Sequence, residues 1–206
     1  RGGAVAIVGG NHEFRNCLIV TNSLELRGYG GDGIYSQDAT TRVVNCTVAD
    51  NGWHPNKPIG FLRDGLRQAG SGIFDVRNSI VYGNQTNDLA GFATNALGEL
   101  VNVHYSCIGD GQNDGVQGCF KADPLFADRF HYHELSRKGY YSGGYWSGGV
   151  WLTASETSPC IDAGDPNDPY DLEPEPNGKR INLGAYGNTE TASLTARPGG
   201  TLIIIR

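Results

Sequence analysis

The last quarter of the chain contains the densest group of carboxylates in the sequence. Six acids fall within 14 residues, and four prolines lie among them or directly after the last acid. Ca²⁺ takes six to eight oxygen ligands, and closely spaced aspartates in a folded loop can supply several of them. The spacing differs from the EF-hand pattern, and a solvated, turn-rich loop is the alternative interpretation. The candidate metal ligands are Asp162, Asp165, Asp168 and Asp171.

An aromatic stretch precedes this loop. Its rings are interleaved with Ser and Gly in the sequence YYSGGYWSGGVW. Ring faces can stack on the apolar faces of sugars while neighbouring polar groups fix the orientation. The same pattern also fits a β-hairpin whose rings pack on the last of the repeats described below. The candidate carbohydrate-binding residues are Tyr140, Tyr141, Tyr145, Trp146 and Trp151.

Residues for polysaccharide cleavage are few and lack a recognisable local motif. Glycoside hydrolysis needs two carboxylates, and elimination needs a base such as Arg or Lys near acids that bind Ca²⁺. Arg63 and Asp64 lie in the longest link between repeats, GFLRDGLRQAG from Gly60, which could form one wall of a groove. A solvated loop with salt bridges is the other interpretation. The sequence therefore favours a non-catalytic protein, with these two residues as weak catalytic candidates.

Five cysteines are present, and none forms a CxxC pair of the kind found in zinc or thioredoxin-type sites. Cys17 and Cys46 occupy equivalent repeat positions, where they either bond or remain buried thiols. Cys107 and Cys119 bracket a polar, Gly-containing loop, and a disulfide there would tie the last regular repeat to the following segment. Such a bridge would indicate an oxidising compartment.

A repeat of about 30 residues organises the first half of the chain. The copies FRNCLIVTN, VVNCTVADN and VRNSIVYGN begin at Phe14, Val43 and Val76, and a weaker copy, HYSCIGDG, begins at His104. Side chains alternate within each copy, which indicates strands. Helical periodicity is missing. The pattern predicts a right-handed parallel β-helix of a few coils in an all-β protein, with an ordinary β-sandwich as the alternative.

Asparagines recur at fixed places in the copies. Asn tolerates left-handed backbone and can hydrogen-bond its own turn, so equivalent asparagines on successive coils should stack into a ladder. The copies end in Asn22, Asn51 and Asn84. We align the copies on Asn16, Asn45, Asn78 and Ser106, so that successive copies are 29, 33 and 28 residues apart.

The repeat is lost from about Asn113 onwards. We predict three parts: coils over 1–112, an irregular capping region over 113–196 packed on the last coils, and a linker with an apolar terminal strand over 197–206. Caps commonly cover the open edge of a coil stack. The terminal strand GGTLIIIR and the first strand, AVAIV from Ala4, could instead pair between molecules, head to tail.

Composition narrows the partners. The net charge is −6 without a basic stripe, so nucleic acid is not an expected partner. No run approaches the roughly 18 apolar residues that span a bilayer. The chain has no Met and enters directly into strand-like sequence, from which we expect that a longer precursor was cut or only partly included.

The second half carries a specific series of motifs: DPLFAD from Asp123, YHELSRKG from Tyr132, TSPCIDAGDP from Thr157 and EPEPNGKRINLGAYGNT from Glu173. This series resembles the ending of bacterial right-handed parallel β-helix repeat proteins, and the NCTV and NSIV copies fit the same family. The resemblance implies the fold and a secreted, extracellular or cell-surface location. It implies no activity, because β-helices include lyases, hydrolases and adhesins.

We therefore expect a non-catalytic extracellular β-helix with a structural, adhesive or carbohydrate-binding role. A polysaccharide or glycan is the expected partner, and Ca²⁺ is the one cofactor that the sequence suggests. A polysaccharide lyase or glycoside hydrolase that acts in a groove on the helix face is one alternative. A filament subunit that self-associates through its terminal strands is the other.

Overall fold

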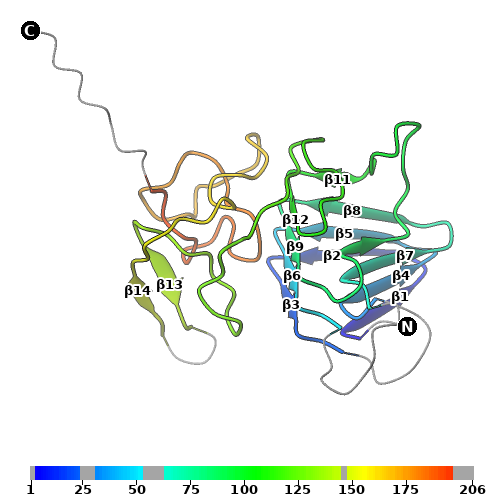
Figure 1. The fold of residues 1–206 in the computed structure, drawn as a ribbon, viewed down its shortest axis with the longest axis horizontal. Helices are drawn as coiled ribbons and strands as arrows, with labels where there is room; N and C mark the ends of the chain where they lie inside the picture. The colour runs from blue at the N-terminus through cyan, green and yellow to red at the C-terminus, as the bar shows by residue number, and fades with distance from the viewer. Residues whose placement is uncertain (1–2, 24–30, 53–62, 145–147, 197–206) are drawn as a thin grey trace, which may run out of the picture.

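The computed structural model describes residues 3–23, 31–52, 63–144 and 148–196. These residues form strands, turns and loops without an α-helix, and the parallel strands stack as a β-solenoid of about 3 turns (Figure 1). The predicted all-β parallel β-helix is confirmed at this level, while right-handed winding stays a prediction. None of the described residues belongs to a helix long and apolar enough to cross a membrane.

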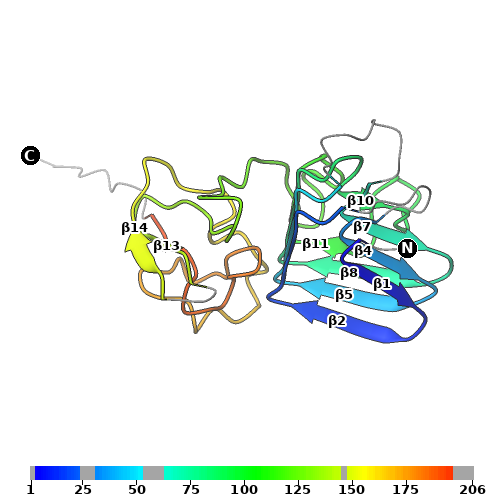
Figure 2. The same cartoon turned by 90° about the horizontal axis from the view of Figure 1, so that it is seen from below.

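Equivalent strands of successive coils pair in parallel and form three sheets (Figures 1 and 2). The first sheet contains β1 (Val5–Val8), β4 (Ile34–Gln37), β7 (Leu66–Ala69) and β10 (Leu89–Ala90). The second sheet contains β2 (Asn11–Arg15), β5 (Thr40–Val44), β8 (Ile73–Arg77) and β11 (Val103–His104). The third sheet contains β3 (Leu18–Val20), β6 (Thr47–Ala49), β9 (Ile80–Tyr82) and β12 (Cys107–Ile108).

Apolar side chains from the three sheets fill the interior in rows. In the second sheet Val43, Val76 and Val103 are register partners, and all three are fully buried. Alternate residues of a strand point to opposite faces, so one row of valines faces the interior while its neighbours face outward. The period-two pattern of the sequence is therefore the pattern of this core.

A left-handed residue turns the chain from the second sheet into the third. Asn16, Asn45 and Asn78 each have φ of 49°, which Asn accepts more readily than most residues. In the fourth coil Tyr105 takes this place, with φ of 42°. The alignment of that coil on Ser106 was wrong by one residue, because β12 pairs Cys107 with Ile80 rather than with the cysteine column.

The expected asparagine ladder is confirmed. The side-chain amide of Asn22 donates to Asn51 Oδ1 at 3.0 Å, and that of Asn51 donates to Asn84 Oδ1 at 2.9 Å. Asn84 in turn donates to Asp88 Oδ1 at 2.7 Å, so a carboxylate ends the ladder. Burial raises the pKa of Asp88 to about 6. Each amide thus links one coil to the next.

The chain from residue 91 to residue 120, which includes β11 and β12, covers the interior at the end of the stack. The ring of Phe92 stacks on Phe74 with centroids 5.2 Å apart, and Leu100 and Cys119 join the same apolar cluster. Phe120 forms a parallel bridge to Cys107, which adds backbone pairing to the last strand. This stretch closes the end of the stack where β10, β11 and β12 would otherwise be open edges.

The described residues of 121–196, which we call the lateral segment, lie beside the third sheet (Figures 1 and 2). Their hydrogen bonds reach three coils: Asn16 donates to Gly187 O at 2.8 Å, and Ala185 N donates to Thr47 Oγ1 at 3.0 Å. Gly184 N donates to the carbonyl of Asn78 at 2.9 Å. The expected cap thus lies along the side of the coils, and the division into domains stays a prediction.

Candidate functional site

The outward face of the second sheet carries rows of charged side chains. Glu13, Arg42 and Asp75 are register partners on β2, β5 and β8, and they form an outward row of alternating charge. Parallel strands are about 4.8 Å apart, so the row presents one charged group at each such step. The pair Arg42–Asp75 has a nitrogen–oxygen distance of 3.8 Å.

A second outward row runs beside the first. It contains Arg15, Val44 and Arg77, again as register partners on the same three strands. Arg15 contacts Glu13 of the first row at 2.9 Å. The two rows together carry arginines and carboxylates within reach of one another, and they form the floor of a hollow.

The hollow lies between these rows and the lateral segment, whose Asp168 and Pro169 form a wall. It has a volume of about 420 Å³, and an adjoining hollow of about 310 Å³ shares Glu13 and Arg42 with it. We call the two hollows together the sheet groove. The groove runs across successive coils and is therefore suited to an extended ligand.

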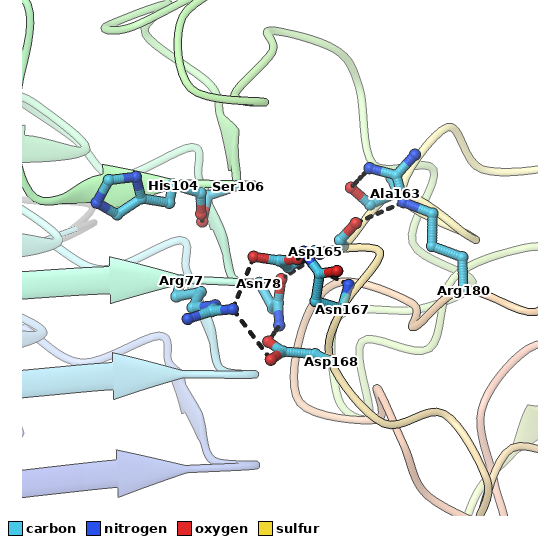
Figure 3. A network of polar contacts seen from close by, with 10 residues as sticks. Arg77, Asn78, His104, Ser106, Ala163, Asp165, Asn167, Asp168 and Arg180 are labelled. Carbon is cyan, nitrogen blue, oxygen red and sulfur yellow. Dashed lines mark hydrogen bonds and ion pairs between the residues drawn. The ribbon is translucent and has the colours of Figure 1, made fainter.

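Hydrogen bonds to the third coil hold the wall in place (Figure 3). Arg77 Nη2 lies 2.6 Å from Asp165 Oδ2 and 3.0 Å from Asp168 Oδ1. Asn78 Nδ2 donates to Asp168 Oδ2 at 2.5 Å, and Asp165 N donates to Asn78 Oδ1 at 2.7 Å. The corner asparagine of the coil thus also anchors the loop that faces the groove.

Two buried polar atoms of groove-lining residues lack a hydrogen-bond partner among the described residues. They are Asn45 Oδ1, an acceptor, and Arg77 Nε, a donor. The Asn45 side chain is 4% exposed. A buried polar atom without a partner is costly to the fold.

The four aspartates of the predicted calcium site do not converge. Asp162 accepts hydrogen bonds from Thr195 Oγ1 and from Gly178 N. Asp165 and Asp168 turn towards Arg77, and Asp171 is exposed. Within the parts of the chain that the structure describes, no group of three or more His, Cys, Asp or Glu side chains could hold a metal ion.

The aromatic stretch forms the expected hairpin from β13 (Tyr140–Ser142) and β14 (Val150–Leu152). Tyr141 pairs with Trp151, and their rings meet edge to face at 5.6 Å. Tyr141 also contacts the ring of His133 at 5.7 Å, so the hairpin packs within the lateral segment rather than on the last coil. Trp151 is 44% exposed. Tyr145 and Trp146 lie outside the described residues.

Arg63 and Asp64 are buried inside the coils. Arg63 Nη1 donates to Gly52 O at 2.7 Å, and Asp64 accepts from Arg67 at 2.6 Å and from Asn87 at 2.7 Å. They are 4% and 0% exposed. These residues join neighbouring turns of chain and do not line the sheet groove, so the structure gives them a stabilising place. Residues 60–62, with which the predicted groove wall begins, lie outside the described residues.

The bridge predicted between Cys107 and Cys119 does not form. All five cysteines are unbonded, and the two side chains belong to different apolar clusters. Phe120 pairs with Cys107, and because neighbouring residues alternate faces, Cys119 points the other way, into the coils. Cys107 points outward, towards the lateral segment.

Sequence reasoning missed a buried carboxyl pair in the lateral segment. Glu134 is fully buried, and burial raises its pKa to about 8. Burial likewise raises the pKa of Glu173 to about 7, although Glu173 Oε1 accepts from the backbone N–H groups of Asn182 and Asn188. Neither residue lines the sheet groove.

Fold and groove together define the class: a parallel β-solenoid with a polar groove across its coils. No family model, no curated protein and no solved structure matches the chain. The bacterial repeat family that the motifs resemble therefore stays a prediction, as do the four-residue calcium site and the aromatic sugar site.

Proposed function

We propose that this protein binds an extended glycan in the sheet groove without cleaving it, as a secreted or surface-displayed protein. The observation that carries the proposal is the outward row of Glu13, Arg42 and Asp75, with one polar group from each coil. The location rests on the sequence resemblance of the lateral segment alone.

The spacing of the groove suits a chain of sugars. Strands repeat about every 4.8 Å, which is close to the length of one sugar unit in an extended polysaccharide. Sugar hydroxyls both donate and accept hydrogen bonds, and charged partners make such bonds stronger. Glu13 and Asp75 can accept from hydroxyls, whereas Arg42 between them can donate.

The charge pairing in the groove argues against hydrolysis. A glycosidase needs one carboxylic acid that keeps its proton, commonly in an apolar pocket. Each groove carboxylate instead contacts an arginine: Glu13 contacts Arg15, Asp75 contacts Arg42, and Asp168 contacts Arg77. These acids are positioned to bind hydroxyls.

Hydrolysis is the second candidate, because two carboxylates of the second sheet line the groove. Glu13 and Asp75 lie on strands two steps apart, so their backbones are about 9.6 Å from each other. An inverting glycosidase would need the two carboxyl groups themselves to be about 6.5–9.5 Å apart. Release of shorter sugars from a polysaccharide during incubation would favour this candidate over binding alone.

Calorimetric titration with neutral and uronic-acid oligosaccharides of increasing length tests the proposal. We expect Arg42→Ala and Asp75→Ala each to weaken binding by at least about tenfold, because each removes a charged hydrogen-bonding group. Lys138→Ala, an exposed change in the lateral segment, is the control. Loss of binding in Trp151→Ala with full binding in Arg42→Ala would move the site to the hairpin and overturn the proposal.

A further inference from the structure

Four of the five cysteines meet in pairs. Cys17 and Cys46 lie on neighbouring coils and pack in one apolar cluster, and Cys107 and Cys160 pack in another. Cys119 is the remaining thiol, and it points to the carbonyl of Val103 inside the coils. Cys107 and Cys160 are 53 positions apart in the chain, and no repeat relates them.

The Cys107–Cys160 contact lies at the seam between the solenoid and the lateral segment. Cys107 continues the outward column of Thr47 and Ile80 on the third sheet. Cys160 faces this column from the lateral segment, in one apolar cluster with Ile80, Cys107 and Leu183. Leu183 N donates to the carbonyl of Cys160 at 2.9 Å, which fixes the backbone there.

Both thiols are fully buried and surrounded by apolar groups. Two buried cysteine side chains that pack together have already lost most of the conformational freedom that formation of a disulfide bond would remove. Their placement on two different parts of the fold also means that a bond would join those parts, whereas a bond between Cys17 and Cys46 would only join coils that are already paired.

We propose that Cys107 and Cys160 are a disulfide site, oxidised when the chain folds in the presence of a disulfide donor, and that the bond fastens the lateral segment to the fourth coil. The donor is an oxidised low-molecular-weight thiol or a disulfide-bearing oxidoreductase. This inference does not depend on glycan binding.

The chemistry is two successive exchange steps. One cysteine, as its thiolate, attacks the donor disulfide and forms a mixed disulfide, which releases one donor thiolate. The second protein thiolate attacks the protein sulfur of the mixed disulfide, so the Sγ–Sγ bond forms and the second donor thiolate leaves. Two electrons pass from the protein to the donor, and the two protons pass to the solvent or to the released thiolates.

The bond would act on the groove through the wall. Asp165 and Asp168 follow Cys160 closely in the chain, and they pair with Arg77 at the edge of the sheet groove. A covalent link at Cys160 therefore holds the segment that carries the wall against the coils. It also closes a long loop in the unfolded chain, which lowers the entropy of that state.

Refolding of the full chain in a buffer of reduced and oxidised glutathione tests the site, because the native thiols are buried. After alkylation and digestion without reductant, mass spectrometry should find the peptides of Cys107 and Cys160 joined, lighter than the two free peptides by two hydrogens. Cys119 should carry the alkyl group. In Cys160→Ser, Cys107 should become alkylated, and Cys119→Ser should keep the link.

Thermal unfolding gives a second readout. Oxidation should raise the Tm of the wild type and of Cys119→Ser by roughly 10 °C, an effect that Cys160→Ser and Cys107→Ser should lack. Alkylation of both Cys107 and Cys160 after refolding with oxidised glutathione would overturn the proposal. So would a link from Cys107 to Cys119.

Discussion

Arg77 and Asp165 form an ion pair of 2.6 Å that joins the third coil to the lateral segment. The Asp165 side chain is only 10% exposed, so it depends on this cation. We expect Arg77→Gln to lower the free energy of unfolding by about 1–3 kcal/mol, because a charged and mostly buried acceptor loses its partner. Urea denaturation measures the change.

An exposed arginine of the same sheet is the matched control. The Arg42 side chain is 59% exposed and 3.8 Å from Asp75, so Arg42→Gln should change the free energy of unfolding by less than about 1 kcal/mol. Equal losses in the two variants would show that the Arg77 pair does not hold the lateral segment.

Substitution of the middle residue of the asparagine ladder, Asn51, should cost the most stability. Asn51 is fully buried, donates to Ile19 O and Asn84 Oδ1, and accepts from Asn22. Asn51→Ala leaves several of these groups without partners, so we expect a loss of about 2–4 kcal/mol in the free energy of unfolding. Chemical denaturation followed by circular dichroism measures it.

Asn22 provides the comparison within the same ladder, because it is only half-buried and lies at the end of the ladder described here. Asn22→Ala should cost clearly less than Asn51→Ala. If the two changes cost the same, the ladder does not depend on burial of its amides.

Glu134 should make stability fall as the pH rises. Its pKa is raised to about 8 from an ordinary value of 4.5, so the folded protein keeps a proton that the unfolded chain releases. The stabilisation is complete below about pH 4.5 and is lost as the pH rises through 8. Between pH 6.5 and about pH 8.5, we expect the free energy of unfolding to fall by roughly 2–3 kcal/mol, with Glu173 contributing.

This window avoids an opposite effect. Burial lowers the pKa of His133 to about 4, which costs stability only as the pH falls below about 6.5. Glu134→Gln should remove most of the decline in unfolding free energy between pH 6.5 and 8.5, whereas Glu156→Gln, an exposed change, should preserve it. An unchanged slope in Glu134→Gln would rule out this carboxyl as the cause.

Close stacking of the coils makes Gly33 irreplaceable. A Cβ there would collide with the carbonyl oxygen of Gly65 on the next coil. Gly33→Ala should therefore lower the free energy of unfolding by about 2–4 kcal/mol, since backbone on both sides must move. Gly148→Ala meets no neighbouring atom and should leave the Tm unchanged. Similar Tm values for the two variants would contradict this account.

The coils could be predicted because each carries its own local signals. Strand alternation marks every copy and a corner asparagine marks the first three, and Asn16, Asn45 and Asn78 share one backbone conformation. The fourth coil was misaligned because its corner residue is Tyr105. Tyr105 has the same left-handed backbone conformation as the corner asparagines, but a tyrosine does not indicate such a conformation in the sequence.

The floor of the groove could also have been read from the repeats. Glu13, Arg42 and Asp75 each stand three residues before a corner asparagine, on the outward side of the strand. The wall of the groove could not be predicted from the repeats, because Asn78 and Asp168 are 90 residues apart and no repeat relates them. The aspartates of the acidic loop are neighbours in the chain but have different partners: Asp162 accepts from Thr195, whereas Asp165 and Asp168 pair with Arg77.

The one-residue-per-coil construction of the row has an evolutionary consequence. Duplication or loss of one repeat unit would preserve the pairing of every sheet, yet it would lengthen or shorten the row by one charged position. The number of coils thus sets the length of ligand that the row can bind. That length can change by one strand spacing at a time, while the spacing itself stays constant.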